Sequence, residues 1–321
     1  MSLTKRTFTN LLGGFLAFQS FNAISQSFPN RTIRIITAEA GGGADFFTRL
    51  VAQGISPALG QAVVVENRGG STSIPAMAVA KAPADGHTLF MYGNGAWITP
   101  LIQPDAPYDA IRDFSPVTLA VSSPNILVVH PSVPVNSVKE LIAYATAQPG
   151  VLNFGSSSAG AGNRLAAELF KSMANVQITH IPYRGAGQAL NALIAGDIQM
   201  MFGAAAAVKP QVASGKLRAL AITSAKPSKV ADLPTVASAG LSDYESVVSY
   251  GVLAPAKTPP VIVSRLQQEI ARAINAADVR EKIANTGAEP VGNSPSDFAQ
   301  IMKSEIARMG GVLKAAGITG N

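Results

Sequence analysis

The 321-residue sequence predicts an α/β protein of two domains that are joined by two strand-like hinges, with a ligand cleft between them. Three observations lead to this prediction. Short apolar strands alternate with amphipathic helices, which is typical of a parallel sheet. Glycine-rich junctions between strand and helix recur in both halves of the chain. Two extended apolar segments, residues 114–131 and 249–255, contain or end in prolines and offer places for the chain to cross between domains.

The first strand-to-helix junction shows the pattern most clearly. Residues 33–37 form a β-rich run, Gly41, Gly42 and Gly43 follow, and an amphipathic helix then carries Phe47 and its apolar neighbours on one face. A strand, a glycine-rich turn and a helix N-terminus direct several free backbone N–H groups at one point, with no Cβ in the way. The junction therefore predicts an anion site made of main chain, although an ordinary tight turn of an α/β domain has the same pattern.

The following segments continue the alternation of strands and helices. Glycine, proline, asparagine and serine separate the segments and predict turns. In the first half we expect strands at 61–66 and 88–92 and a helix at 74–81, and then the apolar run at 114–131, broken by prolines, as the first crossing between domains. In the second half we expect helices at 137–147, 163–173 and 188–195, and strands at 152–155, 176–181, 198–202 and 217–223. The strand at 198–202 leads through residues 203–207 into a further predicted helix.

The C-terminal segment changes character after the strand at 249–255. Helices are predicted at 260–276, 279–285 and 296–316, without a further strand–helix–strand pattern, and we expect them to pack back onto the first domain. The predicted domain 1 is discontinuous and comprises residues 26–124 and 250–321, and domain 2 comprises residues 125–249.

Residues 1–25 predict a cleavable signal peptide. Lys5 and Arg6 give a positive start, residues 11–21 form a short apolar core, and residues 23–25 are small enough for a cleavage site. The apolar core is too short to cross roughly 30 Å of hydrocarbon as a helix. We therefore expect secretion into a bacterial periplasm.

Composition excludes several classes of function. The chain has no cysteine, which removes disulfides, thiolate metal sites and a cysteine nucleophile. His87, His130 and His180 are scattered, so we expect no metal site and no cofactor. The formal net charge is +6, but the basic residues are dispersed without an aromatic-basic stripe, which argues against nucleic acid and fits anionic small molecules.

Several motifs together resemble one family, the Bug receptors, which are periplasmic solute-binding proteins of tripartite tricarboxylate transporters. The order and spacing of the motifs carry the resemblance over residues 28–317. The most specific motif is HIPYRG (180–185) continuing to AGDIQMMF (195–202). The others are RTIRII (31–36), GGGAD (41–45), VVVENR (63–68), ADGHTL (84–89), DFSPV (113–117), PTVA (234–237) and YGVLAP (250–255).

The resemblance implies a type II periplasmic-binding fold that closes over a small organic acid, and no enzymatic activity. The acid is a mono-, di- or tricarboxylate, including the possibility of an amino acid or an aromatic acid. Further partners are the membrane permease subunits of the transporter, and we expect the receptor to be a monomer. In this family helix N-termini and loop N–H groups hold the carboxylates. At matching positions the ligand contacts are Gly41, Gly42, Gly43, Ala44, Asp45, Asn94, Gly95, Ser157, Ser158, Gly160, Gly162, Asn163, Arg184, Gly185, Gly187, Gly203, Ala204 and Ala205.

Two other functions use the same cleft. A periplasmic partner of a signalling protein would sense the ligand instead of delivering it. A secreted serine hydrolase is the third hypothesis, because residues 155–159 approximate a nucleophile elbow and His180 or His130 could act as the base. That motif ends in alanine where the elbow needs glycine, so hydroxyl and backbone donors to an anion are the simpler interpretation.

Three side chains near the predicted site have alternative roles. Arg184 could clamp a carboxylate with its two-pronged guanidinium group or form an ion pair, either on the surface or between the domains. Asp45 could cap or brace its loop or contact the ligand. Trp97 could fill the core or stack on a flat ligand.

Overall fold

The computed structural model describes most of the chain. The described residues are 28–38, 40, 43–69, 71–156, 162–183, 185–227 and 231–315. The predicted signal peptide, residues 1–25, lies outside them.

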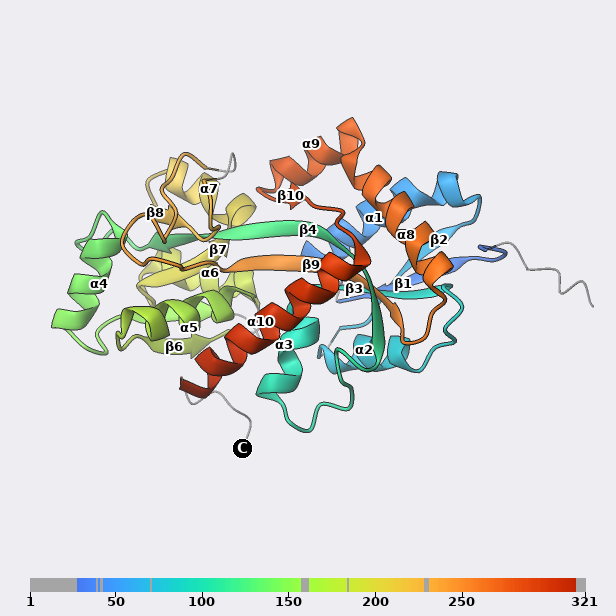
Figure 1. The fold of residues 1–321 in the computed structure, drawn as a ribbon. Helices are drawn as coiled ribbons and strands as arrows, with labels where there is room; N and C mark the ends of the chain where they lie inside the picture. Colours follow the sequence, from blue (N-terminus) through green and yellow to red (C-terminus); the bar gives the residue numbers. More distant parts are fainter. Residues whose placement is uncertain are drawn as a thin grey trace, which may run out of the picture.

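The strands form one mixed sheet, in the order β2-β1-β3-β9-β4-β7-β5-β6, with β8 and β10 also pairing with β4. Figure 1 shows the sheet running through the whole molecule with helices on both sides. The strands are β1 (Ile33–Thr37), β2 (Val63–Asn67), β3 (Thr88–Tyr92), β4 (Phe114–Val129), β5 (Asn153–Ser156), β6 (Thr179–Pro182), β7 (Met200–Ala204), β8 (Arg218–Ile222), β9 (Val247–Pro255) and β10 (Glu289–Pro290).

The helices fall close to the predicted segments because their apolar residues recur at helical spacing. They are α1 (Gly43–Leu59), α2 (Ser73–Ala80), α3 (Gly95–Ile102), α4 (Val138–Ala147), α5 (Gly162–Ala174), α6 (Ala186–Ala195), α7 (Ala205–Ala213), α8 (Pro260–Asn275), α9 (Ala277–Asn285) and α10 (Pro295–Ala315). Only α3 among them has no counterpart in the sequence prediction.

The half of the molecule around β1, β2 and β3 has a core on each face of the sheet. α1, α8 and α9 pack on one face, where Phe47, Ile55 and Ile270 are buried. α2, α3 and α10 pack on the other face around Phe90 and Trp97. The strands of this half are parallel, as the alternation of strands and helices predicts.

The half around β5, β6, β7 and β8 repeats this arrangement. α4 and α5 cover one face around Phe154 and Phe170. α6 and α7 cover the other face around Leu193 and Val208. β5 pairs in parallel with both β6 and β7.

Two long antiparallel strands, β4 and β9, connect the halves and lie side by side in Figure 1. Residues 114–124 of β4 pair with β9, whereas residues 125–129 pair with β7 and β8. The sequence predicted the first crossing between the domains in this apolar run, which is broken by prolines. In the structure β4 continues through the prolines: Pro116 lies where the register shifts, and Pro124 is the last residue that pairs with β9, so both occupy positions that a sheet tolerates.

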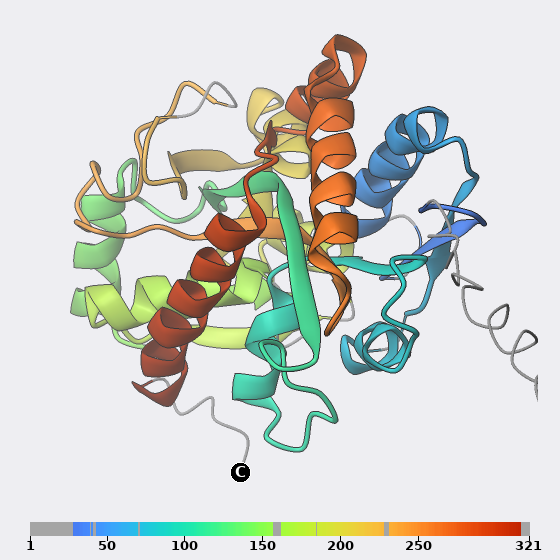
Figure 2. The ribbon, with the colours of Figure 1, turned by 45° about the vertical axis from the view of Figure 1, so that its right-hand side comes forward.

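The prediction of a parallel sheet is therefore wrong for the middle of the molecule. β9 is antiparallel to β3 and β4, and β4 is antiparallel to β7 and β8. The C-terminal helix also differs from its prediction: α10 packs on α3 and β4 but reaches α5 of the other half as well (Figure 2). Its 21 residues are long enough to span both halves.

Candidate functional site

The loops that carry the predicted site follow the carboxyl ends of parallel strands. β3 ends at Tyr92, opposite Gly251 of β9, and β7 ends at Ala204, opposite Asn125 of β4. The carboxyl ends of the parallel strands in both halves therefore face the middle of the molecule, where β4 and β9 pass from one half to the other. This is the edge at which open α/β sheets bind ligands.

The predicted contacts that the structure describes lie at helix N-termini or immediately before them. They belong to α1 (Gly43, Ala44, Asp45), α3 (Asn94, Gly95), α5 (Gly162, Asn163), α6 (Gly185, Gly187) and the turn from β7 into α7 (Gly203, Ala204, Ala205). The other predicted contacts, Gly41, Gly42, Ser157, Ser158, Gly160 and Arg184, lie outside the described residues.

Several of these helices begin without a side-chain cap. α3, α6 and α7 start after Asn94, Gly185 and Ala204, and no side chain there accepts a hydrogen bond from the first turn in the described part of the chain. On α4, by contrast, the Ser137 hydroxyl accepts a hydrogen bond of 3.2 Å from the backbone N–H of Glu140. The first N–H groups of a helix have no partner within it, so at the uncapped helices they remain available to an acceptor.

Glycines from both halves meet the same two residues of β9, Val248 and Tyr250. A Cβ on Gly43 would lie 2.5 Å from the hydroxyl oxygen of Tyr250, and one on Gly162 would lie 2.5 Å from Cγ2 of Val248. A Cβ on Gly93, between β3 and α3, would lie 3.6 Å from Val248 and 3.8 Å from Tyr250. Three loops thus converge on Val248 and Tyr250, and α1 and α5 need glycine there because of close approach.

The remaining predicted glycines that the structure describes differ in what a side chain at their position would contact. A Cβ on Gly185 or Gly187 would meet no described atom within 4 Å, so close packing against the described residues does not require these glycines. A Cβ on Gly203 would overlap Val208, so the packing of α7 on β7 explains this glycine. Ala204, the next residue, is exposed at the sheet edge.

The carboxylate of Asp45 is held by other side chains. It is 5% exposed, accepts a hydrogen bond of 2.8 Å from the side-chain amide of Asn67 and forms an ion pair of 3.0 Å with Arg49. The Asn67 amide also donates to the carbonyl of Ala38, at the end of β1. Asp45 therefore braces the first turn of α1 against β1 and β2. Trp97 is part of the core, at 1% exposed.

Two buried amides near the crossing strands are incompletely hydrogen-bonded within the described residues. The Asn94 amide nitrogen donates to the carbonyl of Val247 at 3.2 Å, but its buried Oδ1 has no partner. Asn125, on β4 opposite Ala204, is 3% exposed, and its buried Nδ2 has no partner. Unsatisfied buried polar atoms are rare in folded proteins and are a reason to expect a bound molecule beside them.

Among the described residues, two serines lie beside histidines. The Ser132 hydroxyl lies 2.8 Å from Nδ1 of His130, two residues away in an exposed segment. The Ser156 hydroxyl lies 2.7 Å from Nε2 of His180, but Ser156 is fully buried and out of reach of a substrate. Burial, with the charges of Arg164 and Lys171, lowers the pKa of His180 to about 4, so its ring is neutral at physiological pH. Ser157, at the nucleophile position of the elbow-like motif, lies outside the described residues. The contact between Ser156 and His180 is therefore better explained as an internal hydrogen bond than as a catalytic pair.

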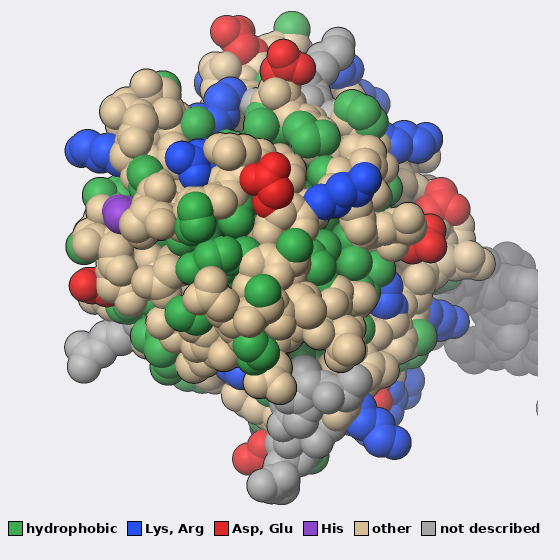
Figure 3. Space-filling view, turned by 90° about the vertical axis from the view of Figure 1, so that its left-hand side faces the viewer, with side chains coloured by type: hydrophobic (Ala, Val, Ile, Leu, Met, Phe, Trp, Pro, Cys, Tyr) green, Lys and Arg blue, Asp and Glu red, His purple; other side chains and the backbone are tan. Residues whose placement is uncertain are grey.

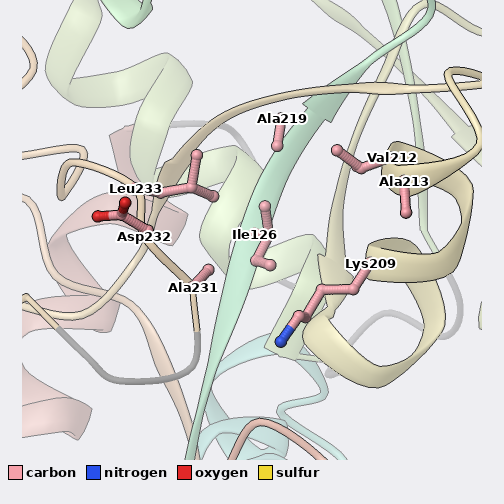
Figure 4. A pocket seen from close by; sticks show the side chains of 8 residues that line it. All are labelled: Ile126, Lys209, Val212, Ala213, Ala219, Ala231, Asp232 and Leu233. Carbon is pink, nitrogen blue, oxygen red and sulfur yellow. The ribbon is translucent and has the colours of Figure 1, made fainter.

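A cavity lies elsewhere on the molecule and has the wrong chemistry for an anion. It has a volume of about 370 Å³ and is lined mainly by apolar side chains of β4, β8, α7 and the segment 231–233 (Figure 4). Lys209 and Asp232 are its charged residues. Their opposite charges and the apolar walls offer a carboxylate little net attraction.

The described residues show no feature of metal binding, no membrane-spanning helix and, on the face in Figure 3, no feature of nucleic-acid binding. No group of three or more His, Asp or Glu side chains is arranged to hold a metal ion. No helix there is long and apolar enough to span a membrane. On the face shown in Figure 3, Lys and Arg side chains are spread out with Asp and Glu among them, without the concentrated patch that nucleic-acid binding requires.

Sequence reasoning missed Val248, Tyr250 and Asn125 as candidate site residues. Tyr250 lies in a motif that was interpreted as a hinge, and Asn125 was placed at a domain boundary. The predicted hinge segments could have indicated these residues, because residues on a strand that joins two halves lie beside any site between those halves.

Known proteins are similar to this chain in sequence. A family model described as the tripartite tricarboxylate transporter family receptor matches residues 47–318. The "UPF0065 protein in tcbD-tcbE intergenic region" of Pseudomonas sp. (strain P51) is 37% identical over 286 residues, covering 88% of this chain and 85% of that protein. Protein BugT of Bordetella pertussis is 33% identical, covering 96% of each chain.

Solved structures confirm the expected fold. R. palustris Rpa4515 with adipate is 38% identical with a TM-score of 0.81, covering 91% of this chain and 99% of that one. MatC (Rpa3494) from Rhodopseudomonas palustris with bound malate is 30% identical with a TM-score of 0.77, covering 89% and 100%. The periplasmic binding protein BugD is 27% identical with a TM-score of 0.78, covering 92% and 100%.

Proposed function

This chain belongs to the tripartite tricarboxylate transporter receptor family, and from that premise we propose that it is a periplasmic receptor that captures a small organic carboxylate and delivers it to membrane subunits of a transporter. The observation that carries the proposal is the convergence of the N-terminal ends of α1 and α5 and of the β3–α3 turn on Val248 and Tyr250. Backbone N–H groups at such termini bind anions without needing a charged side chain.

The ligand class is supported by the related structures. Adipate and malate, bound to Rpa4515 and MatC, are both dicarboxylates of small size. We propose that the ligand of this chain is likewise a small organic acid, held by the predicted contacts at α1, α3, α5, α6 and α7. The membrane partner would be the permease of the transporter, and the receptor would act as a monomer.

We also propose that the halves move as two domains, residues 26–124 with 250–321 and residues 125–249. β4 and β9 are the connections, and the crossing of β9 begins at Val247, which pairs with Pro124. A ligand that contacts both halves would favour the closed arrangement in proportion to its extra contacts there.

Export by a cleaved signal peptide at residues 1–25 is part of the same proposal. It is supported by the charge and apolar pattern of that segment and by the relatives described as periplasmic. The mass of the mature protein purified from a bacterial periplasm would locate the cut.

The proposal is tested by comparing acids with their amides in thermal unfolding. Adipate and malate are compared with adipamide and malamide, which keep the shape but lose the charge. A ligand at about a hundred times its dissociation constant stabilises the folded state by roughly 2.7 kcal/mol. We expect at least one acid to raise the melting temperature while its amide does not. Equal shifts from acid and amide would contradict an anion site.

A further inference from the structure

We infer that the hydroxyl group of Tyr250 is a ligand-binding donor, which together with the first turn of α1 holds one carboxylate oxygen of the ligand. This inference rests on the proposed function and adds a side chain of the crossing strand to a site otherwise made of helix N-termini. It is argued from the position of the ring, the hydrogen bonds of the tyrosines and the charge around the hydroxyl group.

The ring of Tyr250 is held in a fixed position. It packs against the ring of Phe47 with a centroid distance of 4.8 Å and an interplanar angle of 56°. Its far end lies against Gly43, the first residue of α1, and its edge faces Gly93. Because α1 and the β3–α3 turn enclose the ring, the hydroxyl group is directed to the helix N-terminus.

The hydroxyl group lacks the partner that other buried tyrosines have. Tyr244 donates a hydrogen bond of 2.8 Å to the carbonyl of Ala166, and Tyr108 donates one of 2.8 Å to the carbonyl of Ala96. The Tyr250 hydroxyl makes no hydrogen bond with any described residue, although the side chain is partly buried in the core around α1. A phenolic hydroxyl can donate one hydrogen bond, and this one is not committed to a described acceptor, so the position is suited to an acceptor that arrives with the ligand.

The charge around the hydroxyl group selects an acceptor that is an anion. Burial, with the neighbouring phenol of Tyr92, raises the pKa of Tyr250 to about 12, so the group keeps its proton at physiological pH. The N-terminus of α1 carries the positive end of the helix dipole. Asp45 in the same turn is already paired with Arg49 and Asn67. A carboxylate oxygen is therefore favoured over an ammonium group.

The test compares Tyr250→Phe with Tyr244→Phe as a matched control. Each variant loses one phenolic oxygen, but within the described part of the chain only Tyr244→Phe breaks a hydrogen bond. Adipate, malate, succinate and benzoate are titrated by calorimetry into the native protein, and the tightest binder is then titrated into both variants. Urea unfolding without ligand gives the stability of each.

We expect Tyr250→Phe to weaken binding by about tenfold or more, because a hydrogen bond to a charged group is lost, and to leave the urea midpoint unchanged. Tyr244→Phe should lower the midpoint and keep the affinity. Unchanged affinity in Tyr250→Phe, with tight native binding, would overturn this inference and leave the proposed function standing. A native protein that binds none of the four acids would overturn both.

Discussion

The two faces of β9 meet very different surroundings. On one face, the Ser249 hydroxyl donates a hydrogen bond of 3.0 Å to Glu305 of α10, which also accepts one of 2.6 Å from the indole N–H of Trp97. Gly251 on that face lies directly under Phe298. On the opposite face, Val248 and Tyr250 contact glycines of three loops, and the hydroxyl of Tyr250 has no partner among the described residues.

This difference between the two faces of β9 separates the contacts that stabilise the fold from the groups that we expect to bind the ligand. The network of Ser249, Glu305 and Trp97 is complete and buried, so it stabilises the packing of α10 and α3 on the crossing strand. On the face of Val248 and Tyr250, the described residues offer the Tyr250 hydroxyl no acceptor. Substitutions on the first face should therefore change stability, and substitutions on the second face should change affinity.

Truncation of Glu305 should have the largest effect on stability. Glu305→Ala leaves the Trp97 indole and the Ser249 hydroxyl unpartnered in a buried place and creates a void, so we expect a loss of about 3 kcal/mol or more of unfolding free energy. Urea unfolding measures this loss. The affinity of the folded variant for its ligand should stay near the native value. A small stability change with a large loss of affinity would reverse our assignment of the two faces.

Gly43→Ala should have a smaller effect that depends on Tyr250. The new methyl group would lie 2.5 Å from the hydroxyl oxygen but 3.2 Å from ring atom Cζ. We expect about 1–3 kcal/mol of destabilisation from overpacking in the native background, and clearly less in the Tyr250→Phe background. Gly187→Ala is the matched control, since its methyl group would meet no atom of the described residues within 4 Å. Equal effects of Gly43→Ala in both backgrounds would mean that the hydroxyl does not lie at α1.

The pH dependence of stability should show the smallest effect. Burial raises the pKa of Glu305 above its usual 4.5, against the opposing effect of its two hydrogen bonds. The folded state therefore prefers the protonated carboxyl: this contribution to stability is full below pH 4.5 and is lost as the pH rises through the raised pKa. We expect the unfolding free energy of the native protein to fall relative to that of Glu305→Gln across this range. Parallel curves for the two proteins would contradict the raised pKa.

Many of the helices and strands could be predicted from the sequence, because the local spacing of apolar residues indicates them. The strand at 33–37, the helix with Phe47 and Ile55 on its buried face, and the helices after residue 260 all appear as expected. The antiparallel crossing could not be predicted, since strand direction depends on which segments meet in space. α3 was missed because its eight residues include Pro100 and follow a Gly-Asn-Gly turn.

The candidate site likewise has a part that the sequence could predict and a part that it could not. Glycine-rich junctions and the family motifs indicated which helix N-termini to examine, and the described ones lie at the carboxyl edges as expected for such junctions. The role of Tyr250 could not be predicted, because one residue of a hinge strand gives no local signal of which loops will contact it. The same holds for Asn125, whose incomplete hydrogen bonding is visible only in three dimensions.

The most direct test of the central claim, that backbone N–H groups of both halves hold the ligand beside β9, is amide hydrogen exchange with and without the tightest-binding acid. N–H groups in the first turn of a helix exchange readily unless an acceptor binds them. We predict that the ligand slows exchange at the starts of α1 and α3 in one half and of α5 and α6 in the other. Protection confined to one half, or found instead at residues 209–213 and 231–233 around the apolar cavity, would contradict the account.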